Sequence, residues 1–211
     1  MPSVPPGRKQ LVSPFPEARF ERIRSMPEHP VNLSEMQMVV HFGTHVDAPL
    51  HFIADGPAFD AIPLERLFGA GIVIELACSP VHPITPSELQ GADIRAGDIV
   101  LLNTGWTAHG NTPLYDQHPH LTPAAAAWLA DRRIKLLAVD FPSPDLPIAH
   151  REPGFNWPTH LVLLSQGILV SENIRIPAQL RPGRAEFLFL ALNIEGSDGS
   201  PARVLGRNIP A

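Results

Sequence analysis

Four side chains that could bind a metal ion lie within eleven residues of this chain, namely His41, His45, Asp47 and His51. A helix would place His41 and His45 on one face, but it would turn Asp47 about 200° away from His45. Pro49 would also interrupt the helical hydrogen bonds. An extended chain places all four side chains on one side, because they occupy odd positions. The spacing therefore predicts an extended segment that presents three imidazoles and one carboxylate along one wall.

The other side of this segment is apolar, because Phe42, Val46 and Leu50 fall on even positions. Gly43 removes a side chain and leaves room for an ion or substrate to approach the backbone. Imidazoles with one carboxylate suit Zn²⁺ or Mn²⁺, whereas Ca²⁺ and Mg²⁺ prefer shells of oxygen atoms. The alternatives are a metal with a purely structural role and a polar strand without metal. The second would bury histidines and a carboxylate without compensation.

The composition narrows the class of protein. The chain has 211 residues, 44% of them hydrophobic, and a formal net charge of −5, which fits a globular protein and gives no electrostatic reason to bind nucleic acid. Cys78 is the single cysteine, so an intrachain disulfide and an all-cysteine zinc site are excluded. No apolar run approaches the ~20 residues that cross a bilayer, and the start of the chain lacks the apolar core of a signal peptide. We therefore expect a soluble cytoplasmic protein without a membrane partner.

The pattern of apolar residues predicts a mixed α/β chain. Helices are expected at 85–89 and 122–130, each introduced by a threonine and a proline, and at 160–166, where Gly167 would end the helix. No internal repeat or low-complexity linker divides the chain. Short apolar runs predict strands at 36–42, 71–77, 98–103, 134–140, 168–172 and 187–192.

The N-terminal segment 1–30 is rich in proline and lacks periodicity. We expect an arm that extends over the surface or onto a partner chain, with a flexible tail as the alternative. Residues 31–211 would then form the catalytic domain.

The pattern His-x-Gly-Thr-His-x-Asp-x-Pro-x-His at 41–51 resembles the signature of the cyclase family, whose best-characterised members include bacterial kynurenine formamidases and isatin hydrolases. The resemblance extends over roughly residues 31–207. It includes 103–106 with 119–122, the loop 140–145, His160 eleven residues before Ser171-Glu172-Asn173, and the turn at 196–203.

The resemblance implies an α/β fold, here a single domain with a mixed β-sheet core flanked by a few helices, in the swivelling β/β/α class. It also implies a homodimer or homotetramer and a centre with two divalent ions, Zn²⁺ or Mn²⁺. Asp47 and Glu172 are the candidates to bridge the two ions. By motif match, the metal ligands would be His41, His45, Asp47, His51, His160 and Glu172.

These ligands predict hydrolysis. Two divalent ions ~3.5–4 Å apart can bind one water, lower its pKa and stabilise a tetrahedral oxyanion. Either Glu172 or His51 would pass a proton to the leaving group, and the sequence leaves both open. The predicted substrate is a small amide, a formamide of the N-formylkynurenine type, or a lactam or lactone. The alternatives are a metal-dependent cyclase or dehydratase and a non-catalytic metal-binding protein.

Other polar and aromatic residues receive simpler interpretations. Asp198 and Arg203 are expected to form a turn and a structural ion pair, and Cys78 is expected in the core. Candidates for contact with a planar substrate are Trp106, Phe155, Trp157 and His150. The histidines expected to be exposed are His29, His82, His109, His118 and His120.

Overall fold

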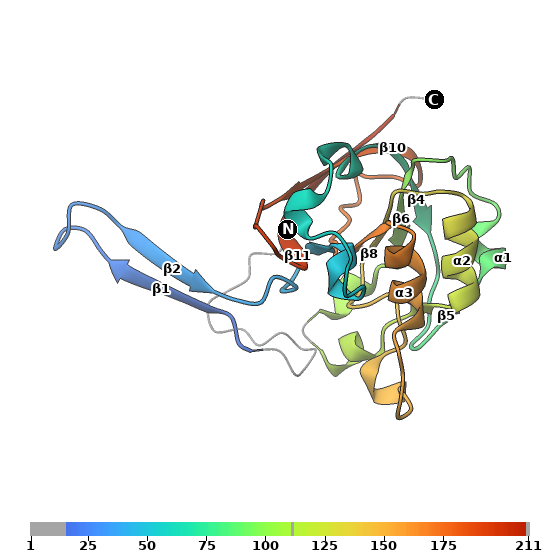
Figure 1. Ribbon diagram of the computed structural model, residues 1–211, viewed down its shortest axis with the longest axis horizontal. Helices are drawn as coiled ribbons and strands as arrows, with labels where there is room; N and C mark the ends of the chain where they lie inside the picture. Colours follow the sequence, from blue (N-terminus) through green and yellow to red (C-terminus); the bar gives the residue numbers. More distant parts are fainter. Residues whose placement is uncertain (1–15, 111, 210–211) are drawn as a thin grey trace.

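Seven strands close into a barrel at the centre of the computed structural model, which describes residues 16–110 and 112–209 (Figure 1). The order around the barrel is β10-β11-β3-β9-β8-β6-β4. Strands β4, β6, β8 and β9 pair in parallel, and the remaining pairs are antiparallel. The mixed β-sheet core is therefore confirmed. Its strands are β3 (His45–Asp47), β4 (Phe68–Glu75), β6 (Ile99–Asn103), β8 (Leu136–Val139), β9 (Leu169–Glu172), β10 (Gly183–Ala191) and β11 (Gly199–Asn208).

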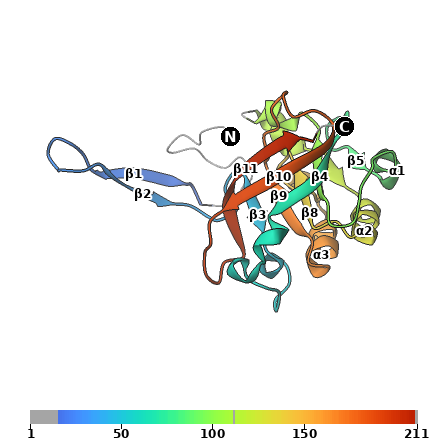
Figure 2. The same ribbon diagram turned by 90° about the horizontal axis from the view of Figure 1, so that it is seen from above.

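The parallel strands have continuous apolar sequences because both of their faces are covered. In β6, Ile99 and Leu101 point into the barrel, whereas Val100 and Leu102 pack toward the helices. Helices α1 (Pro86–Leu89), α2 (Pro123–Asp131) and α3 (Pro158–Ser165) cover this outer face (Figure 2). One hydrophobic cluster therefore fills the barrel, and a second lies between the barrel and the helices. The same strands contribute side chains to both clusters.

The helix ends follow the local sequence signals. Thr122 accepts a hydrogen bond from the backbone N–H of Ala125 at 3.2 Å, as an N-cap residue does. Gly167 has a φ of +70° and its N–H donates to Leu164 O at 3.0 Å beyond the end of α3. The predicted helices are confirmed. Short connecting elements are β5 (Pro83–Ile84), β7 (His120–Leu121) and the 3-10 turns η1 (Pro49–His51), η2 (Phe59–Ala61), η3 (Leu64–Arg66), η4 (Trp106–His109), η5 (Pro113–Gln117) and η6 (Ile148–His150).

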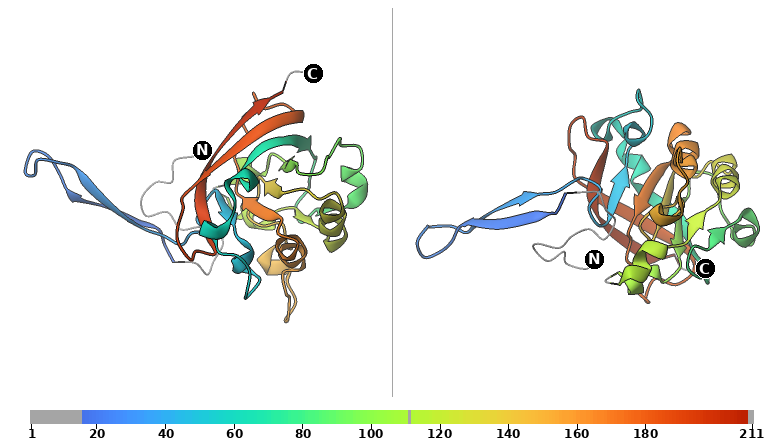
Figure 3. Two further views of the ribbon diagram at one scale, coloured as in Figure 1. Left: turned by 45° about the horizontal axis from the view of Figure 1, so that its top comes forward. Right: turned by 90° about the horizontal axis from the view of Figure 1, so that it is seen from below.

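An antiparallel hairpin of β1 (Arg19–Arg24) and β2 (Leu33–Gln37) projects from the barrel on the side away from the helices (Figures 1 and 3). It crosses the predicted boundary at residue 30, and the first half of the predicted arm, 1–15, lies outside the described residues. The strand predicted at 36–42 is wrong, because β2 ends at Gln37. Among the described residues, no helix is long and apolar enough to cross a membrane.

Candidate metal centre

The segment 41–51 bends, so the prediction of one extended strand is wrong. Gly43 has a φ of +67°, a left-handed conformation that turns the chain before β3. After β3, Pro49 begins the 3-10 turn η1, which contains His51. The segment nevertheless brings its four predicted ligands together, because the two bends fold His41 and His51 back over β3. Their rings stack with centroids 3.8 Å apart.

Asp47 stands at the centre of the cluster. This carboxylate is buried in β3, between β9 and β11. Its Oδ1 lies 2.8 Å from Nδ1 of His41 and 3.1 Å from Nε2 of His45. Its Oδ2 is buried and makes no hydrogen bond in the described structure. A buried carboxylate oxygen without a donor is costly, so this atom is available to a cation.

A second group of candidate ligands faces Oδ2 of Asp47. His160 Nε2 lies 3.6 Å from that oxygen and 3.2 Å from Oε1 of Glu172. Glu172 ends β9 directly opposite His45, and its Oε2 is 3.5 Å from His45 Nε2. Asp47 thus lies between an imidazole pair on one side and a histidine with a glutamate on the other.

Hydrogen bonds at Nδ1 orient the rings of His45 and His160. His45 Nδ1 donates to Gly43 O at 2.8 Å, and His160 Nδ1 donates to Asp145 Oδ2 at 2.6 Å. An oxygen acceptor at one ring nitrogen fixes the tautomer and leaves Nε2 for a metal. In both residues, Nε2 is the atom that faces Asp47 and Glu172.

The charge of the cluster also fits a divalent cation. Burial opposes a charge on His41, but Asp47 and Asp198 outweigh it and raise its pKa to about 9. Burial likewise disfavours the ionised form of Asp47, yet His45 and His160 hold the pKa of this carboxyl well below its usual range. The positive charge of protonated imidazoles therefore compensates the negative charge of the buried carboxylates. A bound cation would displace these protons and take over their charge. The groups that fit an ion are His41 with His45 and Asp47, Asp47 with His160 and Glu172, and His41 with His51 and Asp198.

Asp145 was not recognised as a site residue from the sequence. Besides the ring of His160, it accepts the backbone N–H groups of Thr159 at 2.9 Å and His160 at 3.2 Å, at the start of α3. Burial raises the pKa of Asp145, but the hydrogen bonds from His160 outweigh this and lower it. Its position fifteen residues before His160 gave no signal, because the contact depends on the loop between β8 and α3.

The predicted partner of Asp198 differs from the one observed. The expected ion pair with Arg203 is wrong, because Asp198 Oδ2 instead accepts hydrogen bonds from His41 Nε2 at 2.9 Å and His51 Nδ1 at 3.1 Å. Asp198 precedes β11, whose Gly199 pairs with Asp47. The pairing of β11 with β3 therefore carries this carboxylate to the cluster from 157 residues away in sequence.

We expect Asp198→Asn to weaken metal binding about 10–100-fold, as loss of an outer carboxylate does at metal sites. The amide has the same size as the carboxylate. Because it carries no negative charge, it attracts the N–H groups of His41 and His51 less strongly. Metal affinity is measured by competition with a chromogenic chelator, and turnover is measured in parallel. The exposed Glu195 of the same loop provides the control Glu195→Gln. Wild-type metal affinity and turnover in Asp198→Asn would contradict the role.

His51 lies at the edge of the cluster and is less buried than His45. Burial lowers its pKa to about 4, although Asp47 and Asp198 oppose the shift, so the ring is neutral. Because Nδ1 carries the proton donated to Asp198, Nε2 has a free lone pair. In the described structure, no hydrogen bond is made by that nitrogen.

The predicted substrate residues lie in different places. Trp106 is buried in the cluster between barrel and helices, and its Nε1–H donates to Tyr115 O at 3.0 Å. Trp157 is partly exposed, and its ring centroid lies 5.9 Å from Phe52, which stacks on His160 at 4.5 Å. Phe155 lies beside Trp157, at 5.8 Å between ring centroids. His150 is exposed and donates from Nε2 to Gln117 Oε1 at 2.7 Å. Phe52 was missed.

The remaining histidines differ partly from expectation. His29 is exposed, whereas His82, His109 and His120 are partly buried. The prediction is wrong for His118, which is buried and donates from Nδ1 to Pro119 O at 2.8 Å.

Comparison with known proteins adds four relationships. Residues 6–146 match the family model described as putative cyclase. The chain is 31% identical over 187 residues to a kynurenine formamidase of Salinibacter ruber, covering 89% of this chain and 85% of the relative. Isatin hydrolase A from Ralstonia solanacearum superposes with a TM-score of 0.83 at 25% identity, covering 95% of this chain and 86% of the other. A potential metal-dependent hydrolase with cyclase activity superposes with a TM-score of 0.73 at 29% identity, covering 91% and 88% of the two chains.

Proposed function

This chain belongs to the cyclase family, and from this we propose that it is a metal-dependent hydrolase that cleaves the C–N bond of a small amide. The first candidate substrate is an aryl formamide of the N-formylkynurenine type, because the similar curated proteins are named kynurenine formamidase. Cyclic amides such as isatin are the second candidate, because a structural relative with a TM-score of 0.83 hydrolyses isatin by name.

One observation carries the proposal more than any other. The buried Asp47 directs one oxygen to His41 and His45 and its other, unpartnered oxygen toward His160 and Glu172. A structural site for one ion would need only one of these groups. Two groups that share a carboxylate support two divalent ions, and Asp47 is the proposed bridge, with Glu172 the second candidate.

The proposed metals are Zn²⁺ or Mn²⁺, because the ligand atoms are imidazole nitrogens and carboxylate oxygens. The proposed ligands are His41, His45, Asp47, His160 and Glu172, with His51 and Asp198 at the edge. Divalent ions held there supply a Lewis acid for the amide carbonyl and lower the pKa of water.

His51 is the proposed group that moves the proton. Asp198 holds its Nδ1–H, so the neutral ring presents Nε2 as a base and can later release the proton to the leaving nitrogen. Glu172 is the alternative, but both of its oxygens face imidazoles of His45 and His160, which suits a ligand better.

Aromatic side chains would shape the substrate pocket. Phe52 lies on the ring of His160, and Trp157 extends from it toward solvent. With Phe155, these rings offer an apolar surface against which an aryl group could pack. Trp106 lies in the core beneath the helices, so we keep the pocket role for Trp157 and Phe155 and an outer contact for His150.

Three further features are proposed on less direct support. The catalytic domain is 31–211, the protein works as a homodimer or homotetramer, and it acts in the cytoplasm. The single thiol of Cys78 and a ligand set of nitrogen and oxygen require no oxidising surroundings.

The function is tested with metal-depleted protein restored with Zn²⁺ or Mn²⁺ and offered N-formylkynurenine, isatin and lactones. We expect formamide turnover to vanish on chelation and to return with metal. In ¹⁸O-labelled water, one labelled oxygen should enter the formate, whereas a dehydratase would release an oxygen to solvent. Full activity without metal, or no hydrolysis of any member of the panel, would contradict the proposal.

A further inference from the structure

A guanidinium group lies beside the aromatic rings that we assign to substrate contact. Arg151 follows η6 in the loop between β8 and α3 (Figure 1). Its Cζ lies 4.9 Å from the ring centroid of Phe155 and 5.4 Å from that of Trp157. Contacts between a cation and the face of an aromatic ring are attractive and help to place the guanidinium. Arg151 therefore adds a positive charge to this aromatic surface.

Most of the hydrogen-bonding capacity of Arg151 is unused. Its Nε donates to Leu146 O at 2.7 Å, which ties the side chain to its own loop. Its two terminal nitrogens make no hydrogen bond or ion pair with any residue that the structure describes. The side chain is only partly exposed. A partly buried cation without an anion is unfavourable, so a ligand that brings a carboxylate would gain a strong contact there.

The charge of Arg151 also acts on the metal centre. Burial lowers the pKa of its guanidinium, although Asp145 and Glu172 oppose this shift. An arginine side chain nevertheless stays charged. Asp145 orients His160, and Leu146, which accepts the Nε–H of Arg151, is the next residue in the chain. The same loop therefore places both the carboxylate that orients His160 and a cation close to the cluster.

Three kinds of group follow one another outward from the metal centre. Phe52 stacks on His160, with ring centroids 4.5 Å apart. Trp157 lies 5.9 Å from Phe52, and Arg151 lies over Trp157. The order is metal centre, aromatic rings and cation. N-formylkynurenine has a matching order, namely a formamide, an aryl ring and a side chain that ends in a carboxylate, whereas isatin carries no anion.

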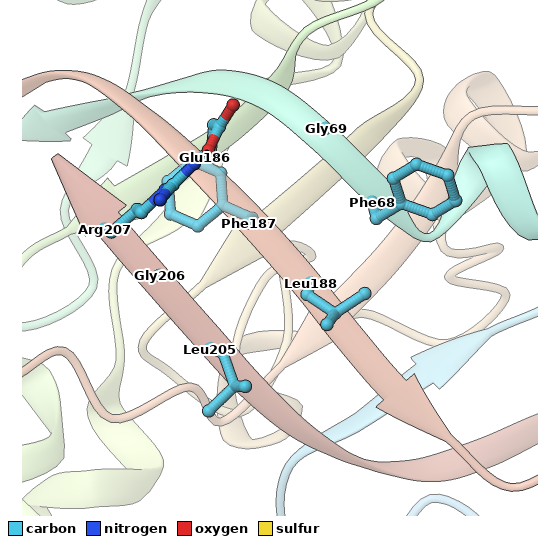
Figure 4. A pocket seen from close by; sticks show the side chains of 8 residues that line it. All are labelled: Phe68, Gly69, Glu186, Phe187, Leu188, Leu205, Gly206 and Arg207. Carbon is cyan, nitrogen blue, oxygen red and sulfur yellow. Dashed lines mark hydrogen bonds and ion pairs between the residues drawn. The ribbon is translucent and has the colours of Figure 1, made fainter. Parts of the chain in front are cut away.

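The groove on the opposite wall of the barrel offers no such site. It has a volume of about 390 Å³ and is lined by residues of β4, β10 and β11, none of which is a candidate ligand (Figure 4). Its arginine, Arg207, already has an anionic partner, because its Nε donates to Oε2 of Glu186 at 2.6 Å. Arg151 is therefore the better candidate to bind a carboxylate of the substrate.

We propose that Arg151 binds a carboxylate of the substrate and so selects acidic aryl formamides over neutral amides. A guanidinium presents its N–H groups as a planar fork that fits a carboxylate with two parallel hydrogen bonds. The aryl ring would pack against Trp157, and the formamide would then lie toward His51 and the candidate ligands. This inference rests on the proposed function and narrows it, because it favours an N-formylkynurenine-like substrate over isatin.

Two substrates that differ only at the carboxylate test the proposal, namely N-formylkynurenine and its carboxamide. Metal-restored protein is assayed by release of the aryl amine. We expect the wild type to prefer the carboxylate in kcat/KM by about 10- to 100-fold, the range for hydrogen bonds to a charged group. Arg151→Gln should lose this preference through a higher KM for N-formylkynurenine. Arg151→Lys should keep part of it, because lysine retains the charge without the fork.

Arg132→Gln is the matched control. Arg132 also lies over a tryptophan ring, 3.2 Å from the centroid of Trp128, and donates to a backbone oxygen, but it stands at the end of α2. This variant should keep the preference of the wild type. Equal losses for both substrates in Arg151→Gln would indicate that Arg151 only stabilises its loop, and would overturn the proposal. A wild type that does not distinguish the two substrates would do the same.

Binding of the products separates this inference from the proposed function. Calorimetry gives the dissociation constants of kynurenine and of its carboxamide without any turnover. We expect kynurenine to bind the wild type about 10- to 100-fold more tightly, and the two to bind Arg151→Gln equally. If neither formamide is hydrolysed, the proposed function fails, but this ratio still decides the role of Arg151. A ratio near one in the wild type would exclude it.

Discussion

Asp47→Asn should reduce bound metal to background and lower kcat/KM at least ~1,000-fold, equivalent to about 4 kcal/mol of transition-state stabilisation. Asparagine has the same shape, so β3 should keep its place between β9 and β11. It lacks the charge that both groups of ligands share, and a neutral amide is a weak ligand for Zn²⁺ or Mn²⁺. Both proposed positions should therefore lose their ion together. Removal of a ligand that belongs to one group alone should remove the ion from that position only.

The measurements for Asp47→Asn are metal content per chain by mass spectrometry and turnover of N-formylkynurenine. The exposed Asp55, four residues beyond His51, provides the control Asp55→Asn. Thermal unfolding of metal-free protein separates loss of metal from loss of fold. An Asp47→Asn protein that keeps both ions and its activity would exclude the bridging role.

The second large effect is expected at His51. His51→Asn should lower kcat about 100- to 10,000-fold, the range for removal of a positioned acid–base group, with little change in metal content. The two ligand groups that share Asp47 do not include His51. Its Nε2 has no hydrogen bond in the described structure, and its Nδ1 is oriented by Asp198. Its contribution is therefore expected in proton transfer.

Metal content decides between the two roles that the sequence left open for His51. If His51→Asn loses an ion along with its activity, His51 is a ligand and Glu172 becomes the candidate for proton transfer. The exposed His29 of the hairpin provides the control His29→Asn, which should leave both quantities unchanged.

Much of the scaffold could be predicted because its signals are local. The apolar runs that form β4, β6, β8, β9 and β10 are short and flanked by turn residues. Threonine followed by proline marks the start of α1 and α2 for reasons of backbone geometry within one turn. Strand β11 was missed, because its outward Arg203 and Arg207 and its Gly206 weaken the apolar pattern.

The extended conformation of 41–51 was predicted from odd–even spacing alone. That argument treats Gly43 as a missing side chain, but its positive φ turns the backbone. The four side chains still converge, since a bent segment can bring close residues together in more than one way. The proximity of the four candidate ligands was therefore predicted more robustly than the local structure that was inferred to present them.

Residue type and order by themselves predicted the chemistry, from four candidate ligands within eleven residues and a single cysteine, which leaves nitrogen and oxygen as the donors. His160 and Glu172 were added by the resemblance to the cyclase family. The tertiary structure alone decided which carboxylates lie beside these histidines. Asp198 reaches His41 and His51 through the pairing of β11 with β3, and Asp145 reaches His160 through a loop. Such contacts depend on which distant segments lie side by side in the fold, and the spacing of residues along the sequence does not predict this.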